Sequence, residues 1–536
     1  MNVAIAQLRC VATDIGRHCR LTFKSMSWRG MLAVIALGIA GCSGSSGTPP
    51  ANPIPQLGKI KHVVFIIQEN HTFDSIFGGP NGFPGADTVS SGKLSNGTTF
   101  AFTELSMGNQ PGLENQYQDW LKSCDPDPKV KLQVGQPWPC RMDGFDQVRV
   151  NGGPQTNPYS YPPPAQVAPY FDIAHKYAVG DHFFASHNSE SYTAHQFLFS
   201  GQAGGLPGTV DDPQPELDPK TSADRLYGSW NCSPAGVAVN QHLSQWSPDV
   251  LTPGAVEVPI PSLTTPPTEI LTGPSPPCWS YPSLADLLNA RQTSWRVYAP
   301  FTLFSVNSLA SMKSIYNNPK YWPPGCAGLT CSNNDYFRSN LAQFLADDTS
   351  VSLPNYPTKP KYKTLAAVTW ILASLNDSDH PLGIANPPSQ GPAWVASIID
   401  AIGKSPDWSS TAIFVLWDDW GGYYDHVPPY VLRDAAGVGF RVPLLIVSPY
   451  TKPGCILKTN TEFGTLLKYT EDTFDLGTLG ANTVDQSPFL GNLDQCFDYT
   501  TVRPFVPVIG SKDLLYWGPH FDGQPSNAQS QIRNDN

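Results

Sequence analysis

Charged residues are scarce in this sequence. They make up 14% of the 536 residues, whereas soluble domains usually carry roughly 25%. The formal net charge is −11, so the chain lacks the basic surplus that binds nucleic acid or an anionic membrane surface. We therefore expect no nucleic-acid partner and no polybasic membrane contact.

Long apolar runs are also missing. The N-terminal run MLAVIALGIAGCSG, residues 31–44, has about ten apolar residues, too few to span a bilayer but typical of a signal-peptide core. Arg29 supplies positive charge before it, and IAGC at 39–42 resembles a bacterial lipobox, in which the cysteine is lipidated. We predict a signal segment over residues 1–42. The protein is then exported, as a periplasmic or cell-envelope lipoprotein anchored through Cys42 or as a secreted protein.

The cysteines lack the paired CxxC spacing of a structural zinc site. Of the 11 cysteines, three fall in the targeting segment and eight remain. An even number in an exported chain predicts disulfide bonds. We expect sequential pairing, with Cys124–Cys140 and Cys326–Cys331 as local loop links. The other four are Cys232, Cys278, Cys455 and Cys496.

Glycine and proline, by contrast, are abundant, with 45 and 54 residues. They indicate many turns and long loops rather than long helices. Residues 43–58 are predicted to form a Ser/Gly/Pro linker, residues 59–518 one large domain, and residues 519–536 a polar tail. Within the domain, Pro-rich stretches near 205–280 and 320–362 are predicted to be loop insertions.

Apolar, strand-like segments alternate with amphipathic, helix-like ones along the domain. The strand candidates are residues 60–70, 176–186, 294–300, 362–371, 411–417 and 442–450, and the helix candidates are 283–291, 393–404 and 463–474. The alanines and leucines of 362–371 also suit a helix. Apolar strands that alternate with helices predict an α/β fold with a mainly parallel sheet flanked by helices on both faces.

Polar side chains follow two of these strands at their carboxyl ends, the edge where open α/β sheets bind ligands. Glu69 and Asn70 follow the first strand, and Asp418 and Asp419 follow residues 411–417. Carboxylate and amide oxygens are the ligands that hard divalent cations prefer. These residues therefore predict a divalent-metal site. The alternatives are a turn or helix cap for the first pair and a solvated loop for the second.

A hydroxyl nucleophile is predicted in SYTAHQFLFS, residues 191–200, which begins like a helix. Ser191 lies in the first turn, where backbone N–H groups and the helix dipole favour an alkoxide and a bound phosphate. We predict Ser191 as the nucleophile and as a further metal ligand. An N-capping serine is the structural alternative. Thr193 is the other hydroxyl within reach, and Ser189 is less well placed.

Five spaced motifs resemble the bacterial phosphoesterase family that contains phospholipase C enzymes and an acid phosphatase branch, within the alkaline-phosphatase-like superfamily. They are IKHVVFIIQENHTFDSIFG, MDGF, SDHP, TAIFVLWDDWGGYYDHVPP and FRVPLLIVSPYTKPG, in this order over residues 59–500. The resemblance implies an alkaline-phosphatase-like core and metal-dependent hydrolysis of phosphate esters through a covalent phospho-enzyme. It puts the family's metal-binding residues at Glu69, Asn70, Asp418 and Asp419.

The resemblance also implies a branch of that family. The acid phosphatase branch has Ser at the nucleophile position followed at +4 by His, which matches Ser191 and His195. The phospholipase C branch typically has Thr and then an Asn-Arg pair, which is absent here. His380 of SDHP matches a histidine of the family's site. Sulfatase chemistry is disfavoured because the chain has no Cys-x-Pro-x-Arg sequence.

The predicted function is that of a metal-dependent phosphoric ester hydrolase, an acid-phosphatase-like phosphomonoesterase. In this mechanism His380, with His195 or His426, binds the phosphoryl oxygens or protonates the leaving alkoxide. For His426 the alternative is structural, because a contact with Asp425 can pin its loop. Two other functions remain open: a phospholipase C that cleaves phospholipid head groups, and an inert, surface-anchored binding lipoprotein.

Overall fold

The computed structural model describes most of the chain between residues 56 and 512. The described ranges are 3–13, 16–26, 56–115, 117–188, 191–203, 279–299, 307–322, 335–338, 364–374, 376–381, 388–431, 438–481 and 483–512, with short strands at 215–216, 242–244, 257–258 and 269–271. The predicted lipobox, the polar tail and most of the two predicted insertions lie outside these residues.

Two compact units divide the chain, Met1–Ile54 and Pro55–Asn536. In the first unit, β1 (Val3–Thr13) and β2 (Gly16–Met26) pair as an antiparallel hairpin. The second unit contains every residue that the sequence marks as a candidate for metal binding or catalysis. Among the described residues, no helix has both the length and the apolar character needed to cross a membrane.

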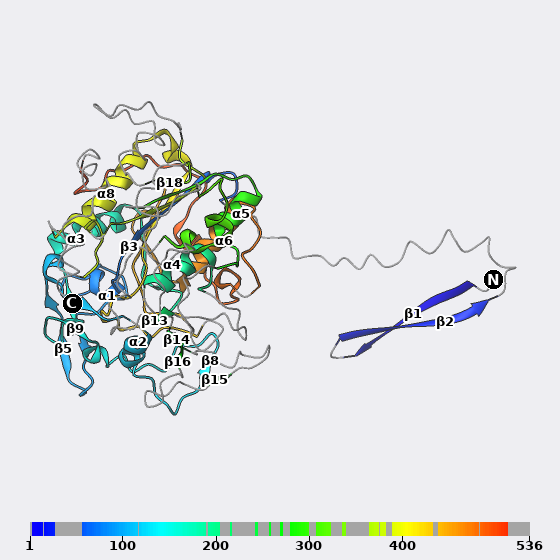
Figure 1. Ribbon diagram of the computed structural model, residues 1–536, viewed down its shortest axis with the longest axis horizontal. Helices are drawn as coiled ribbons and strands as arrows, with labels where there is room; N and C mark the ends of the chain where they lie inside the picture. Colours follow the sequence, from blue (N-terminus) through cyan, green and yellow to red (C-terminus); the bar gives the residue numbers. More distant parts are fainter. Residues whose placement is uncertain are drawn as a thin grey trace. The chain divides into compact units, whose positions relative to one another are not determined.

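An eight-stranded sheet runs through the second unit (Figure 1). In spatial order its strands are β18 (Phe337–Arg338), β17 (Trp295–Tyr298), β19 (Val368–Leu372), β3 (His62–Gln68), β20 (Thr411–Trp417), β21 (Leu444–Val447), β11 (Ala178–Gly180) and β22 (Cys455–Leu457). In this sheet β21 is antiparallel to β20 and β11, and the other neighbours are parallel. The predicted mainly parallel sheet is confirmed.

The two middle strands, β3 and β20, are apolar because both faces of the sheet are covered. Every residue of both strands is buried. Phe65 of β3 lies between Trp370 and Phe414, with ring centroids 6.0 and 5.9 Å away on the two neighbouring strands. Such continuous burial is typical of parallel strands between two helical layers. It explains why neither strand shows alternation of polar and apolar residues.

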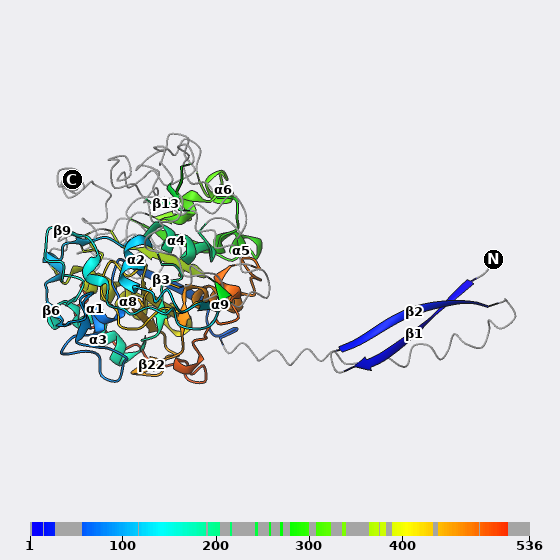
Figure 2. The same cartoon turned by 90° about the horizontal axis from the view of Figure 1, so that it is seen from below.

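Helices cover the sheet on both sides. The described helices of the second unit are α1 (Phe73–Phe77), α2 (Tyr117–Cys124), α3 (Pro164–Lys176), α4 (Ser191–Ser200), α5 (Leu284–Ala290), α6 (Lys313–Tyr316), α8 (Gln390–Gly403) and α9 (Phe463–Phe474). The helices α3 and α8 pack together on one side, and α4 contacts α5 and α9 on the other (Figure 1). Figure 2 again shows α4 next to β3. Phe199 of α4 stacks on Trp370 of the sheet at 5.0 Å.

Short strands complete the second unit. They are β4 (Ser91–Lys93), β5 (Thr99–Ala101), β6 (Thr103–Glu104), β7 (Gly112–Leu113), β8 (Leu132–Gln133), β9 (Val150–Asn151), β10 (Ser160–Tyr161), β12 (Phe183–Phe184), β13 (Pro215–Glu216), β14 (His242–Ser244), β15 (Glu257–Val258), β16 (Glu269–Leu271) and β23 (Thr461–Glu462). They pair in two- and three-stranded sheets outside the central one.

One predicted strand, residues 176–186, is wrong as a single element. It forms β11 in the central sheet and β12, which pairs with β23 in a different sheet. Between them lies Asp181, which accepts hydrogen bonds from the Asp87 N–H and from Lys458 Nζ, both at 3.0 Å. A buried charged side chain with its own partners interrupts the apolar run. The other five predicted strands and all three predicted helices are present, although β19 begins only at Val368.

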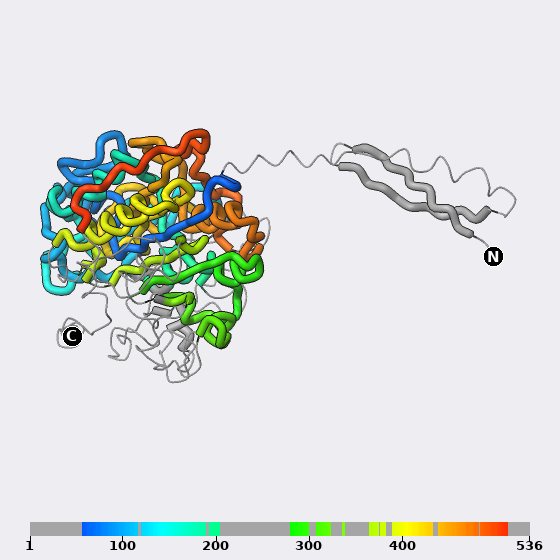
Figure 3. The backbone as a smooth tube through the Cα atoms, turned by 90° about the horizontal axis from the view of Figure 1, so that it is seen from above, coloured from blue at the N-terminus to red at the C-terminus, as the bar shows by residue number. Residues whose placement is uncertain are grey.

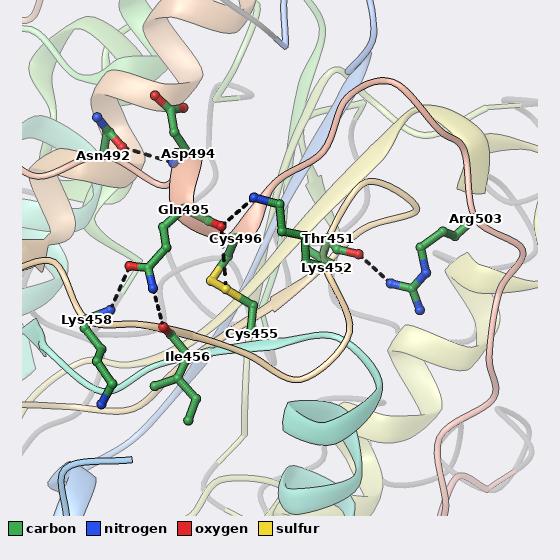
Figure 4. Close-up of a disulfide and its surroundings, with 10 residues drawn as sticks. All are labelled: Thr451, Lys452, Cys455, Ile456, Lys458, Asn492, Asp494, Gln495, Cys496 and Arg503. Atoms are coloured by element: carbon green, nitrogen blue, oxygen red, sulfur yellow. Dashed lines mark hydrogen bonds between the residues drawn. A yellow bond between two sulfur atoms is a disulfide. The ribbon is translucent and has the colours of Figure 1, made fainter. Parts of the chain in front are cut away.

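Two disulfide bonds link neighbouring cysteines in the described chain. Cys124 pairs with Cys140, as predicted, and Cys455 of β22 pairs with Cys496 (Figure 4). Both follow sequential pairing, whereas Cys232, Cys278, Cys326 and Cys331 lie outside the described residues. Beyond Cys496, the last described segment runs beside α8 (Figure 3), where the Val508 N–H donates to Asp400 Oδ1 at 2.8 Å.

Candidate active site

The register between β3 and β20 brings Glu69 and Asp418 side by side. The two parallel strands pair Gln68 with Trp417, the last residue of each. The pairing of the two strands extends by one residue, because the Asp418 N–H donates to the Gln68 carbonyl at 3.1 Å. Both carboxylates therefore emerge at the same edge of the sheet, with relative exposures of 6% for Glu69 and 0% for Asp418. Glu69 and Asp418 thus lie close together at the ends of β3 and β20, as the sequence analysis expects.

Asn70 links the ends of the two strands. Its backbone adopts the left-handed region, with φ of 56°, which is uncommon for a residue other than glycine and concentrates at functional sites. The Asn70 N–H donates to Asp418 Oδ1 at 2.9 Å, and its Nδ2 donates to Asp419 Oδ1 at 2.9 Å. Asn70 Oδ1 is buried and has no hydrogen-bond partner.

The two glycines after the paired acids are required by close packing. Gly421 has φ of +59°, and a Cβ at this position would lie 2.6 Å from the backbone oxygen and the Cβ of Asn70. Gly422 has φ of +81°, and its Cβ would lie 2.5 Å from Leu113. Glycine alone allows this backbone to pass so close to Asn70. The glycine pair thus fixes the turn that presents Asp419.

Asp419 faces the predicted nucleophile. Ser191 is the first residue of α4, and its Oγ donates to Asp419 Oδ2 at 2.9 Å. The other carboxylate oxygen, Oδ1, accepts three hydrogen bonds. The donors are the Gly421 N–H at 2.7 Å, Asn115 Nδ2 at 2.8 Å and Asn70 Nδ2 at 2.9 Å. Asp419 is thus held with one oxygen directed at Ser191. Thr193, the other candidate hydroxyl, is 1% exposed.

His195 lies one turn along α4 from Ser191, on the same face of the helix. Its Nε2 is 3.4 Å from Glu69 Oε1 and 3.6 Å from Asp418 Oδ2. The side chain is fully buried. Burial opposes its charged form, but the two carboxylates outweigh that effect and raise the pKa of His195 to about 9.

Acidic side chains outnumber basic ones among these buried groups. Burial and then the neighbouring Asp418 raise the pKa of Glu69 to about 8, and they raise the pKa of Asp419 well above its usual value. Burial also opposes ionisation of Asp418, yet His195 keeps its pKa below the ordinary value. A bound cation would relieve this imbalance, because it stabilises ionised carboxylates that burial otherwise disfavours.

His380 belongs to the surroundings of this group. It follows β19 in the SDHP motif, and its N–H donates to Ser378 Oγ at 3.3 Å. Burial lowers the pKa of His380 to about 4, and the nearby Asp418 opposes this effect. The imidazole is therefore neutral at pH 7. Its Nδ1 is buried and has no hydrogen-bond partner.

His426, predicted as a further catalytic residue, is part of a different network. Its Nδ1 lies 2.6 Å from Asp74 Oδ2, and its Nε2 lies 3.2 Å from Asp87 Oδ1. The fully buried Arg441 donates from Nε to Asp425 Oδ1 at 2.8 Å and supplies the opposite charge. Among the described hydrogen bonds and ion pairs, those of His426 remain within this network. These contacts fit the structural alternative, and its catalytic role stays a prediction.

Two residues of these networks escaped the sequence analysis. Asn115 lies in a polar loop after β7, far from any predicted motif, and no pattern in the sequence marks it. Arg441 lies in FRVPLLIVSPYTKPG. The sequence could have marked it, because an arginine next to an apolar strand needs acidic partners. Its partners, however, are set by tertiary structure alone.

The residues fit a divalent cation. Glu69, His195 and Asp418 each offer one ligand atom, and these atoms lie within 4.8 Å of one another. Asp418 Oδ2, Asn70 Oδ1 and both nitrogens of His195 are buried without hydrogen-bond partners. Buried polar atoms normally have hydrogen-bond partners. Atoms that bind a metal ion would lack such partners when no ion is present, as these atoms do.

Comparison with protein families gives a match over most of the chain. The model of the Phosphoesterase family matches residues 60–477. The matched range includes both strand ends, α4 and the SDHP motif.

Curated relatives include several proteins named as phospholipases C. The non-hemolytic phospholipase C of Burkholderia pseudomallei is 34% identical over 142 residues, which cover 22% of this chain and 20% of the relative. The non-specific phospholipase C3 of Arabidopsis thaliana is 35% identical over 182 residues, covering 29% and 32%. Phospholipase C A of Mycobacterium tuberculosis is 24% identical over 212 residues, covering 33% and 39%. The matches thus span well under half the length of these relatives.

A similar solved structure is that of a protein in the alkaline phosphatase superfamily from Vibrio parahaemolyticus. The alignment covers 78% of this chain and 67% of that chain, with 12% sequence identity and a TM-score of 0.28.

Replacing Gly421 tests the close approach to Asn70. We expect Gly421→Ala to reduce activity at least 10-fold, because the new Cβ meets the Asn70 backbone and shifts the turn that holds Asp419. Gly97→Ala is the matched control, since Gly97 has φ of +83° but open space around its Cβ. The control should lose about 1 kcal/mol of stability and keep its activity. Equal activity in the two variants contradicts the packing argument.

Proposed function

Because the chain belongs to the Phosphoesterase family, we propose that it is a metal-dependent hydrolase of phosphate esters with Ser191 as its nucleophile. The observation that carries this proposal is the 2.9 Å contact between Ser191 Oγ and Asp419 Oδ2 at the start of α4. The hydroxyl lies at a helix N-terminus, where a phosphate is favoured, and beside the buried group that fits a cation. Glu69 and Asp418, with Asn70 and Asp419 next to them, would hold that cation.

The proposed reaction begins with Ser191. A bound divalent ion lowers the pKa of a nearby hydroxyl and neutralises charge on a phosphoryl oxygen. Ser191 Oγ attacks phosphorus in line and forms a phosphoserine, while the ester P–O bond breaks and the leaving alkoxide takes a proton from water to depart as the alcohol. Asp419 Oδ2 accepts the hydroxyl proton across the 2.9 Å hydrogen bond. Water then attacks the phosphoserine, which releases phosphate and restores the serine.

His380 has a defined part in this mechanism. Because burial lowers its pKa to about 4, the imidazole is neutral at pH 7 and donates one N–H hydrogen bond. We assign that N–H to a non-bridging phosphoryl oxygen, whose charge grows as Ser191 attacks. In this role His380 stabilises the transition state and does not protonate the leaving group.

Two substrate classes fit this chemistry. A phosphomonoesterase is supported by the serine at position 191 with a histidine at 195, the pattern of the acid phosphatase branch. A phospholipase C is supported by the names of the relatives. We propose the phosphomonoesterase first and the phospholipase C as the second candidate.

We also propose that the protein is exported. The signal-like segment at 31–44 and the predicted lipobox cysteine Cys42 support a periplasmic or cell-envelope lipoprotein, or a secreted protein. The disulfides Cys124–Cys140 and Cys455–Cys496 fit an oxidising compartment. Lipidation at Cys42 would be the contact with the membrane.

Replacing the nucleophile tests the mechanism. We expect Ser191→Ala to lower kcat by a factor of about 10⁴ or more, because no hydroxyl remains to form the covalent intermediate. The variant should keep close to the parent's metal content, since Glu69 and Asp418 are unchanged. Thr193→Val is the matched control two residues further along the same helix and should keep most activity. Near-parental turnover in Ser191→Ala would move the nucleophile elsewhere.

A substrate comparison separates the two candidate activities. We expect purified protein to hydrolyse a chromogenic phosphomonoester faster than a phosphocholine diester, and to lose both activities after treatment with a chelator. Metal added back should restore them. Faster cleavage of the diester would identify the phospholipase C instead. A protein that hydrolyses neither substrate and retains no stoichiometric ion after dialysis would be the inert binding lipoprotein.

A further inference from the structure

His195 stands out among the buried histidines of the second unit. It is fully buried, and neither ring nitrogen has a hydrogen-bond partner among the residues that the structure describes. His71, also fully buried, has Ser75 Oγ 3.0 Å from Nδ1 and the Asp379 carbonyl 3.1 Å from Nε2. An imidazole that is buried without hydrogen bonds is costly. Another kind of interaction must therefore compensate for the burial of the His195 imidazole.

The ring of His195 points at two carboxylates. Its Nε2 is 3.4 Å from Glu69 Oε1 and 3.6 Å from Asp418 Oδ2. These distances are too long for strong charge-assisted hydrogen bonds, which are usually about 2.7–2.9 Å. The three atoms nevertheless lie within 4.8 Å of one another, close enough for one ion to touch all three.

The oxygen of Asp418 that faces the ring is free for a ligand. Asp418 Oδ1 accepts from the N–H groups of Asn70 at 2.9 Å and Asp419 at 2.8 Å. Asp418 Oδ2 is buried and has no hydrogen-bond partner. The backbone thus holds one oxygen and leaves the other directed at His195 and Glu69.

Asp419 differs from Asp418 in this respect. Both of its oxygens are engaged, Oδ1 by Asn70, Asn115 and Gly421 and Oδ2 by Ser191. Asp419 Oδ2 thus contacts the nucleophile, whereas Asp418 Oδ2 has no hydrogen-bond partner among the described residues.

We propose that His195 Nε2 is a ligand of the divalent ion at this site, together with Glu69 and Asp418, so that the site has mixed nitrogen and oxygen ligands. Such a set favours Zn²⁺ or Mn²⁺ over Ca²⁺ and Mg²⁺, which prefer oxygen ligands alone. This inference rests on the proposed function for the presence of the ion. It adds a nitrogen ligand to the oxygen ligands that the sequence predicts.

The arrangement also couples the ion to the nucleophile. His195 and Ser191 are four residues apart on the same helix, and residues at this spacing share a face. A ligand and a nucleophile on one rigid element keep a fixed separation. A shift of α4 would therefore change metal binding and the position of Ser191 Oγ together.

Electron spin-echo spectroscopy of the full chain loaded with one equivalent of Mn²⁺ tests this proposal without an activity assay. We expect a ¹⁴N coupling from a directly bound imidazole, and its replacement by a ¹⁵N coupling when the protein is grown with ¹⁵N-labelled histidine. This result needs no variant. A bound ion without any nitrogen coupling overturns the proposal, as does failure of the protein to bind either Mn²⁺ or Zn²⁺ at one equivalent.

Two variants assign the nitrogen. We expect His195→Gln to abolish the coupling and weaken Zn²⁺ binding on the order of 100-fold, while Mg²⁺ binding changes little because an amide oxygen replaces the imidazole. His380→Gln, which changes a partly buried histidine near Asp418, should keep the coupling. A coupling that survives in His195→Gln, or disappears in His380→Gln alone, overturns the proposal.

The proposed function fails in a different way. An active, chelator-sensitive enzyme without nitrogen coupling removes His195 as a ligand and leaves the phosphoesterase intact. A nitrogen-coupled ion in a protein that hydrolyses no phosphate ester supports the ligand assignment and removes the proposed activity.

Discussion

The site depends on the parallel pairing of β3 and β20. Both strands are buried along their whole length, so their register is fixed by packing on two faces of the sheet. A slip of one residue would turn every side chain to the opposite face. It would separate Glu69 from Asp418 and remove the hydrogen bond from Asn70 N–H to Asp418 Oδ1. Strand pairing thus sets the distance between acids that lie far apart in the sequence.

Burial of acids without enough counter-charge gives this site its chemistry. Around His426, the acids Asp74 and Asp425 are balanced by the buried Arg441, which lies 3.3 and 2.8 Å from them. Around Glu69 and Asp418 the corresponding positive group is a single imidazole at longer distances. The first network is an ion-paired support for the loop after β20. The second retains unsatisfied atoms, which is the state expected of a ligand site.

The sequence predicts much of this arrangement, because the strands that carry the acids are short, mainly apolar segments. The segments 60–70 and 411–417 become β3 and β20, and α4 begins at the predicted Ser191. The sequence does not predict the order of strands in the sheet or the loop partners. Asn115 reaches Asp419 from a loop without any regular pattern, and such contacts arise only from tertiary packing. For the same reason the local motif does not predict the contacts of His426 with Asp74 and Asp87.

The central claim is that two strand ends and the start of α4 form one site for a cation and a phosphoryl group. The most direct measurement is a crystal structure of the protein with a divalent ion located by anomalous scattering and with orthovanadate as an analogue of the pentacoordinate phosphoryl group. The account predicts the ion between Glu69 and Asp418 and vanadium bonded to Ser191 Oγ. An ion bound elsewhere, or vanadate on another hydroxyl, would contradict it.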